Sequence, residues 1–320
     1  MDARTLHIVT AVSNPIGWES RIRLAKQAVL GWLSEPNVHV TIVECAYGGR
    51  AHDFDELAQL NADRVSHVKV RASTLVWNKE NLLNIGISRL PPDAKYIGTF
   101  DADITFRRVG WAENIIRALD IYPVIQPWDK CYDLGPNDEH MQTHVSFASI
   151  FHAGGPVVPN GQKWWKSDGG PYEYAHSGFA YAWTRDILDR LGGLFEIGAM
   201  GSGDHHMALS LVGKAAWSIP PGTNANYALA IKRWEASALA HVNGKLGFIH
   251  NTIEHWFHGK KQLRAYNSRW EMFLEHAFDP ITDIKKNTHG VIEFSGNKPT
   301  LERAFDRYLR SRSEDSNSLT

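Results

Sequence analysis

Residues 77–106 constrain the fold of this chain more than any other stretch. Apolar side chains recur at helical spacing over residues 82–90, and Pro91 and Pro92 would end that helix. A short apolar run at residues 96–100 follows and suits a buried strand. Helix, proline turn and buried strand in this order are typical of an α/β unit with a parallel sheet.

Two aspartates, Asp101 and Asp103, come directly after this predicted strand. In an extended chain, residues two positions apart point to the same side, so both carboxylates would lie outside the carboxyl end of a strand. Open α/β sheets bind their ligands there. A divalent cation would relieve the repulsion between the two charges. The alternative is a solvated turn with two incidental acids, because short motifs recur by accident.

The first third of the chain alternates strands with helices, which predicts a mostly parallel sheet flanked by helices. We expect further strands over residues 6–12, 38–43 and 65–70 and a helix over residues 19–33. Residues 128–176 are rich in Gly, Pro and aromatic side chains and are predicted to be a long functional loop region.

The second half of the chain gives fewer signals. Thr184 is predicted to cap a helix that ends near Gly192. We expect a helix from Asp204 to about residue 212, strands over residues 215–219 and 246–252, and a helix over residues 260–276.

Composition argues against a nucleic-acid-binding protein, a disulfide-rich protein and a membrane-spanning protein. The 320 residues carry a net charge of -1, so no global field attracts the chain to nucleic acid or to an acidic membrane. Two cysteines cannot build a disulfide framework, which fits a reducing compartment. No apolar run approaches the roughly 20 residues of a membrane span. We therefore expect a cytoplasmic protein without a membrane span.

Two clusters offer further chemistry. Asp204 follows a glycine-rich turn at a predicted helix start, where it could act as a general base or simply cap the helix. His255 and His258 would share one face of a helical turn and, with Asp103, form a mixed oxygen and nitrogen site that suits Mn²⁺. The alternative is two incidental histidines among 16.

Aromatic and basic side chains supply two weaker signals. Five aromatic side chains in the loop region could stack on sugars or bases: Trp128, Trp164, Trp165, Tyr172 and Tyr174. The alternative is that these rings fill the core. Lys261 and Arg264 would share one helix face and could meet phosphate, unless they belong to a solvated basic surface.

Taken together, these blocks resemble GT-A glycosyltransferases, especially the β-1,4-galactosyltransferase group. The resemblance rests on WNKENLLNIG followed by YIGTFDADITF, then on SGFAYAWTRDILDRLGGLFE and GSGDHHMALSLVGKA in the same order. His255 and His258 match the spacing of a metal-ligand pair further along those chains. The resemblance spans residues 9–258 and implies the GT-A fold, with a mostly parallel central sheet flanked by helices.

The resemblance also implies roles for individual residues. Asp103, His255 and His258 would hold Mn²⁺ or Mg²⁺, and Asp204 would be the catalytic base. Donor contacts are expected from these residues: Asn14, Pro15, Arg21, Trp77, Asn78, Lys79, Asp101 and Asp103. Acceptor contacts are expected from these: Trp164, Trp165, Tyr172 and His205.

The expected function is metal-dependent transfer of a sugar from a nucleotide-diphosphate sugar, foremost a UDP-sugar, to an acceptor hydroxyl with inversion. The acceptor would be a saccharide or a hydroxymethylated pyrimidine in phage DNA, and the location the cytoplasm, including that of a phage-infected host. Alternatives of another class are a non-catalytic sugar-nucleotide binding module and a nucleotidyltransferase. We expect a catalytic domain over residues 1–278, a helical extension over 279–310 and a disordered tail over 311–320.

Overall fold

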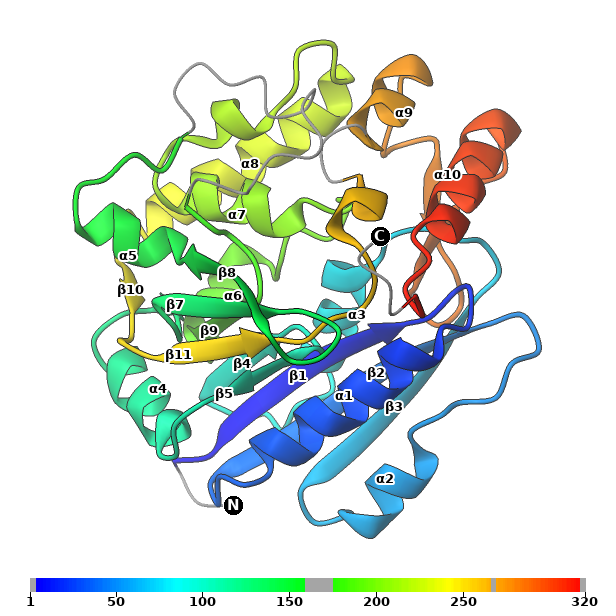
Figure 1. Cartoon of the computed structure of the whole chain (residues 1–320). Helices are drawn as coiled ribbons and strands as arrows, with labels where there is room; N and C mark the ends of the chain where they lie inside the picture. The colour runs from blue at the N-terminus through cyan, green and yellow to red at the C-terminus, as the bar shows by residue number, and fades with distance from the viewer. Residues whose placement is uncertain (1–3, 159–174, 266–268, 317–320) are drawn as a thin grey trace.

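A seven-stranded sheet forms the centre of the computed structural model, which describes residues 4–158, 175–265 and 269–316. Its strands are β1 (Leu6–Ser13), β2 (Val38–Tyr47), β3 (Val65–Ala72), β4 (Tyr96–Phe100), β6 (Val124–Gln126), β9 (Ala180–Thr184) and β10 (Leu246–Phe248). They lie in the order β10-β6-β9-β4-β1-β2-β3, and only β9 runs antiparallel to its neighbours (Figure 1). The predicted α/β class with a mostly parallel central sheet is confirmed.

Helices cover both faces of this sheet. One face carries α1 (Glu19–Trp32), α2 (Asp55–Leu60) and α4 (Trp111–Leu119). The other carries α3 (Lys79–Ile87), α6 (Arg185–Leu191), α7 (Gly203–Leu211) and α8 (Ala225–His241). Adjacent side chains of β1 therefore enter different cores, with Ile8 on the α1 side and Val9 on the α3 side. Burial on both faces explains why the strands read as continuous apolar runs.

Helix α3 lies close to the sheet because Gly86 faces it. A Cβ atom on Gly86 would stand 2.4 Å from Cγ1 of Val9 and 2.6 Å from Cγ2 of Val43. This approach fixes the helix against β1 and β2. It places the first residue of the helix, Lys79, at the edge where these parallel strands end.

A second sheet of four strands lies beside the first, in the order β5-β11-β7-β8. Its strands are β5 (Ile104–Phe106), β7 (Lys130–Leu134), β8 (His140–Val145) and β11 (Thr252–His255). Strand β5 follows β4 after only three residues, so the turn with Asp101 and Asp103 joins the two sheets.

The predicted loop region at residues 128–176 is wrong for its described part. It contains β7, β8 and the helix α5 (Phe147–His152). The two strands pair antiparallel across a turn in which Gly135 N–H donates to the carbonyl of Glu139. Polar side chains on β8, such as His140 and Thr143, obscure the apolar alternation of that strand.

Other boundaries also differ from the predictions. The segment over 215–219 forms a 3-10 helix (Ala215–Ser218) rather than a strand, because the Ser218 hydroxyl donates to the carbonyl of Ala215. The expected helix over 260–276 is a 3-10 helix (Lys261–Arg264) and then α9 (Arg269–Glu275), because Ala265 adopts a left-handed φ of 45° that ends the first. The predicted strand over 246–252 divides into β10 and β11.

The segment after residue 278 contains a hairpin, β12 (Ile284–Lys286) with β13 (Ile292–Phe294), and the helix α10 (Pro299–Ser311). Residues 311–316 pack against the domain instead of continuing as a disordered tail, and Glu314 is only 1% exposed. The prediction rested on low hydrophobicity, whereas paired charges order this segment: Glu314 pairs with Arg21 and Arg312. Within the described ranges, no helix has the length and apolar character needed to cross a membrane.

Candidate active site

Strand pairing in the second sheet brings two distant parts of the chain together. Strands β5 and β11 run antiparallel, with His255 opposite Ile104, and the Trp256 N–H donates to the carbonyl of Asp103 at 2.9 Å. His255 therefore lies beside the turn that carries Asp101 and Asp103.

The three predicted metal ligands form one cluster. Oδ2 of Asp103 lies 3.8 Å from Nε2 of His255 and 3.1 Å from Nε2 of His258. One ligand atom from each residue lies within 4.8 Å of the others. The expected helical turn is wrong, because His255 ends a strand and His258 lies in the following loop.

The cluster fits a divalent cation. Oδ1 of Asp103 is buried and has no hydrogen-bond partner among the described residues, an arrangement that is costly unless a ligand satisfies it. One carboxylate and two imidazoles suit Mn²⁺ better than Mg²⁺, which prefers oxygen ligands. Burial opposes the ionised form of Asp103, yet His255 and His258 hold its pKa below the usual value.

His255 is oriented by a buried carboxylate. Its Nδ1 lies 2.6 Å from Oδ1 of Asp133 on β7, so Nδ1 donates and Nε2 turns toward Asp103. Burial opposes ionisation of Asp133, but its contacts with His144, His255 and Lys261 keep its pKa well below the usual value. No local pattern around Asp133 predicts this role, because its position depends on the pairing of β7 with β11.

Lys79 and Asp101 form an ion pair next to the cluster. The Lys79 ammonium lies 3.0 Å from Oδ1 of Asp101. Burial and the charge of Asp103 raise the pKa of Asp101, and the charge of Lys79 opposes that rise. The two aspartates thus differ: Asp103 faces histidines, and Asp101 faces a lysine at the start of α3.

Asp204 lies at the second position of α7, after Ser202 at the N-cap and Gly203. It is half-buried, and its Oδ1 accepts from the N–H of His205 at 2.8 Å. A Cβ atom on Gly178 would stand 2.7 Å from Oδ2 of Asp204, so the glycine makes room for this carboxylate. The simple N-cap interpretation does not describe Asp204, because Ser202 occupies that position.

A second acid, Glu80, is buried close to this helix start. A Cβ atom on Gly203 would stand 2.6 Å from the carboxyl carbon of Glu80. Burial raises the pKa of Glu80 to about 7, and the charge of Asp204 adds to the rise while Lys79 opposes it. Glu80 was not among the residues predicted from the sequence.

The remaining predicted donor contacts lie where β1 and β2 end and α3 begins. The Asn14 side chain holds its own turn, since its Oδ1 accepts from the N–H groups of Gly17 and Trp18. Asn78 is buried, and its Nδ2 lies 3.5 Å from the hydroxyl of Tyr47. Three further predicted contacts lie in this area: Pro15, Arg21 and Trp77. Their role in donor binding stays a prediction.

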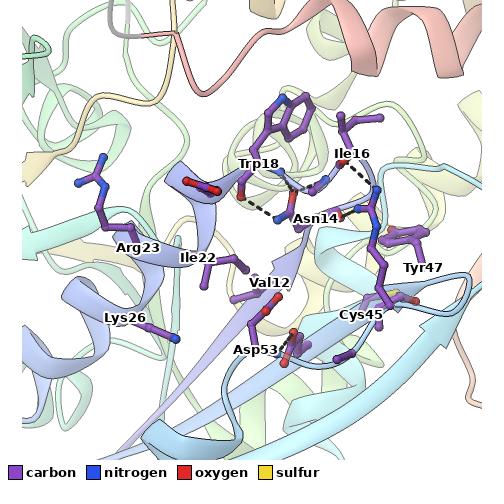
Figure 2. A pocket seen from close by; sticks show the side chains of 16 residues that line it. Val12, Asn14, Ile16, Trp18, Ile22, Arg23, Lys26, Cys45, Tyr47 and Asp53 are labelled. Atoms are coloured by element: carbon purple, nitrogen blue, oxygen red, sulfur yellow. Dashed lines mark hydrogen bonds between the residues drawn. The ribbon is translucent and has the colours of Figure 1, made fainter.

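A cavity of about 800 Å³ opens at the same end of β1 and β2, on the α1 side (Figure 2). Its lining includes Asn14, Trp18, Arg23, Lys26 and Tyr47. This volume is in the range of small-molecule sites. The cavity was not predicted from the sequence.

The predicted acceptor contacts are placed only in part. Trp164, Trp165 and Tyr172 lie outside the described residues, as does Tyr174. His205 is buried, which lowers its pKa to about 4, and its acceptor role stays a prediction. Trp128 is fully buried, makes edge contacts with the rings of His176 and Phe179, and fills the core.

The basic pair is only partly solvated, since the side chain of Lys261 is 38% exposed and Arg264 is buried. Arg264 is 3% exposed, and Lys261 contacts Asp133 and Gln142. Lys261 therefore supports the carboxylate behind His255. Its predicted contact with phosphate stays untested.

Comparison with known proteins shows likeness only in structure. No family model and no curated protein matches the sequence. A structure of S. aureus TarS 1–349 is similar, with a TM-score of 0.40 and 8% identity over 65% of this chain and 55% of that one. The chain thus spans about half the length of that structure.

Two other similar structures are the catalytic domain of Drosophila β-1,4-galactosyltransferase 7 in complex with xylobiose and the mannosyltransferase PcManGT from Pyrobaculum calidifontis with GDP-Man and Mn²⁺. The first has a TM-score of 0.41 and 10% identity over 93% of this chain and 97% of that one. The second has a TM-score of 0.44 and 15% identity over 97% and 73%. Similarity at this level does not by itself assign a function to this chain.

Proposed function

We propose that this chain is a metal-dependent glycosyltransferase of the GT-A type. It would transfer a sugar from a nucleotide-diphosphate sugar to an acceptor hydroxyl with inversion. The observation that carries the proposal is the cluster of Asp103, His255 and His258. Asp103 lies in the turn after β4, so the cluster lies at the carboxyl edge of a mostly parallel sheet.

Asp103, His255 and His258 would hold Mn²⁺ or Mg²⁺, with Asp133 fixing the ring of His255. A bound cation at this position would neutralise negative charge that develops on the departing diphosphate. Oδ1 of Asp103 is buried and has no hydrogen-bond partner in the part of the chain that the structure describes, which supports this role.

Asp101 would accept hydrogen bonds from hydroxyls of the donor ribose or sugar. Lys79 holds its carboxylate at 3.0 Å and balances its charge, so Asp101 is oriented before the donor arrives. The other expected donor contacts lie at the same edge of the sheet: Asn14, Pro15, Arg21, Trp77 and Asn78.

Asp204 would take the proton from the acceptor hydroxyl as that oxygen attacks the sugar. Its carboxylate is half-buried and lies at the start of a nine-residue helix, where the dipole favours the ionised form. Asp204 also contributes to the electrostatic environment of Lys79 and Asp101. This shared environment supports one site that contains base, donor contacts and metal ligands.

We propose a UDP-sugar as donor and a saccharide as acceptor. The net charge of -1 gives no general attraction to DNA, so a modified DNA base is the second candidate acceptor. We also propose a cytoplasmic location, including that of a phage-infected host, because Cys45 and Cys131 are buried and unpaired.

Turnover of a panel of UDP-, GDP- and CMP-sugars, with and without Mn²⁺, tests the proposal. Released nucleotide is measured by mass spectrometry for the unchanged protein, for Asp103→Ala and for Asp189→Ala, a control outside the cluster. We expect turnover of one donor that depends on Mn²⁺ and is lost only in Asp103→Ala. Full turnover by Asp103→Ala, or none by the unchanged protein with any donor, would refute the assignment.

A further inference from the structure

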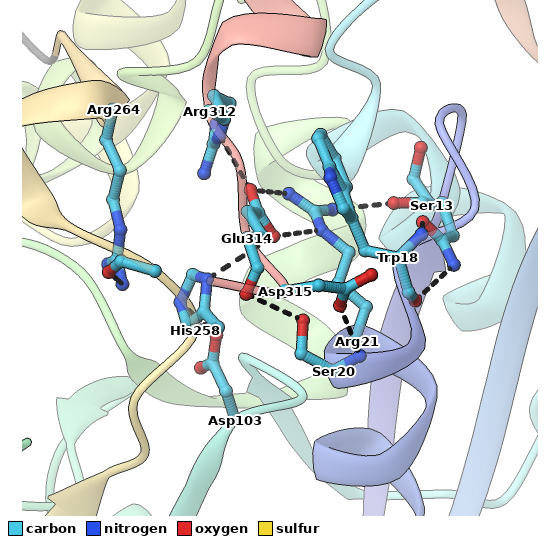
Figure 3. A network of polar contacts seen from close by, with 12 residues as sticks. Ser13, Trp18, Ser20, Arg21, Asp103, His258, Arg264, Arg312, Glu314 and Asp315 are labelled. Carbon is cyan, nitrogen blue, oxygen red and sulfur yellow. Dashed lines mark hydrogen bonds and ion pairs between the residues drawn. The ribbon is translucent and has the colours of Figure 1, made fainter. Parts of the chain in front are cut away.

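Each histidine of the metal cluster has a carboxylate on the side away from Asp103. Nδ1 of His255 forms a hydrogen bond with Asp133 at 2.6 Å. Figure 3 shows Glu314 beside His258, where Oε2 lies 3.3 Å from Nδ1, an ion-pair distance at which the geometry of a hydrogen bond is not met. Both rings direct Nε2 toward Oδ2 of Asp103. A carboxylate therefore lies behind each ring: one from the second sheet is hydrogen-bonded to His255, and one from the segment after α10 is at ion-pair distance from His258.

Glu314 is held firmly enough to orient a ring. Its side chain has 0% exposure, and Arg21 donates to both carboxylate oxygens, from Nε at 2.6 Å and from a terminal nitrogen at 2.8 Å. Arg312 Nε lies 2.6 Å from Oε1. Two guanidinium groups compensate the desolvation of this carboxylate and fix its plane.

The neighbouring residues anchor Glu314 to α1. Ser20 Oγ donates to the carbonyl of Glu314 at 3.0 Å. The Asp315 carboxylate accepts from the N–H groups of Glu19 at 3.1 Å and Ser20 at 2.8 Å. The N-cap residue of α1, Trp18, forms no side-chain cap, so Asp315 supplies that cap from far along the chain.

We propose that Glu314 is a positioning residue for the metal site: its carboxylate fixes the ring of His258 with Nε2 turned toward the cation. This inference rests on the metal site of the proposed function. Carboxylates in this position set the tautomer and orientation of metal-binding histidines. An inhibitory role, with Glu314 in place of a ligand, does not fit, because Glu314 lies on the Nδ1 side and Asp103 on the Nε2 side.

Glu314→Gln tests the inference, because it preserves shape and removes the charge. Mn²⁺ affinity is measured by titration calorimetry without any donor, next to the free energy of unfolding without metal. Glu271→Gln, the same change at an exposed position on α9, is the matched control. We expect Glu314→Gln to bind Mn²⁺ roughly 10- to 100-fold more weakly and the control to bind as the unchanged protein does.

Two results would overturn the inference. Equal Mn²⁺ affinity in Glu314→Gln, with only the unfolding free energy lowered, would assign Glu314 a purely structural role. Tighter Mn²⁺ binding would show that Glu314 obstructs the site. Because no donor is present, failure of sugar transfer by the unchanged protein leaves this comparison intact and refutes only the proposed function.

Hydrogen exchange in the unchanged chain gives a second test that needs no stable Glu314 variant. Coupling between two sites is reciprocal, so Mn²⁺ should slow amide exchange over residues 312–316 if Glu314 supports the metal site. The same addition to Asp103→Ala should leave exchange unchanged. Equal exchange with and without Mn²⁺ in the unchanged protein would contradict the inference.

Discussion

Glu80 offers a sharp test of the electrostatics of the site. It is 2% exposed and follows Lys79 at the start of α3. Burial raises its pKa from 4.5 to about 7, with a further contribution from Asp204. The folded protein therefore keeps a proton on Glu80 at pH values where the unfolded chain has lost it.

The sign and the size of the effect follow from this difference. A raised pKa in the folded state stabilises the fold below the unfolded pKa, and this contribution is lost as the pH rises through the folded pKa. The shift from 4.5 to about 7 corresponds to about 3 kcal/mol at 1.36 kcal/mol per pKa unit. Most of it should disappear between about pH 5 and pH 8.

Glu80→Gln removes this titration. We would measure urea unfolding by circular dichroism at pH 5, 7 and 9 with EDTA, for the unchanged protein, Glu80→Gln and Glu271→Gln. From pH 5 to pH 9, the unfolding free energy of Glu80→Gln relative to the unchanged protein should rise by roughly 2–3 kcal/mol. The exposed control should show no such trend. A pH-independent difference for Glu80→Gln would refute the reasoning.

Two further predictions concern the base and the packing. Asp204→Asn should reduce turnover by about 10²- to 10⁴-fold while Mn²⁺ and donor binding persist in calorimetry; a normal rate would place the base elsewhere. Gly86→Ala should lower the urea-unfolding free energy by about 1–3 kcal/mol, because its Cβ would overlap Val9 and Val43. Gly49→Ala, which faces open space, should change it little, and equal values for both variants would contradict the close packing of α3.

The sequence predicted the parts of the fold that rest on local pattern. Strand β4 has the bounds expected from its apolar residues, and Thr184 caps α6 as expected. Helix α8 was not predicted, although its buried residues Tyr227, Ile231, Trp234 and Ala238 recur at helical spacing. This apolar pattern is present in the sequence, but the charged residues between its members make it less distinct.

The residues of the candidate site also divide into those that the local sequence predicts and those that it does not. The position of Asp103 at the end of a strand follows from the geometry of an extended chain. His255 and His258 were grouped with it correctly, but they were predicted on a helical turn, whereas His255 ends a strand and His258 lies in the following loop. Their true position depends on the pairing of β5 with β11, which the local sequence does not encode. The carboxylates behind the rings, Asp133 and Glu314, lie on segments whose neighbours are set by long-range contacts.

The cap that Asp315 gives to α1 also bears on the order of folding. Ser20 and Asp315 are 295 residues apart in the chain, so forming their contact costs a large loop-closure entropy. The contact can therefore form only after the intervening sheet is ordered. The start of α1 therefore remains open in any partly folded state. Because the same segment carries Glu314, a chain that has not completed its folding would hold His258 less firmly, and metal affinity would report on complete assembly.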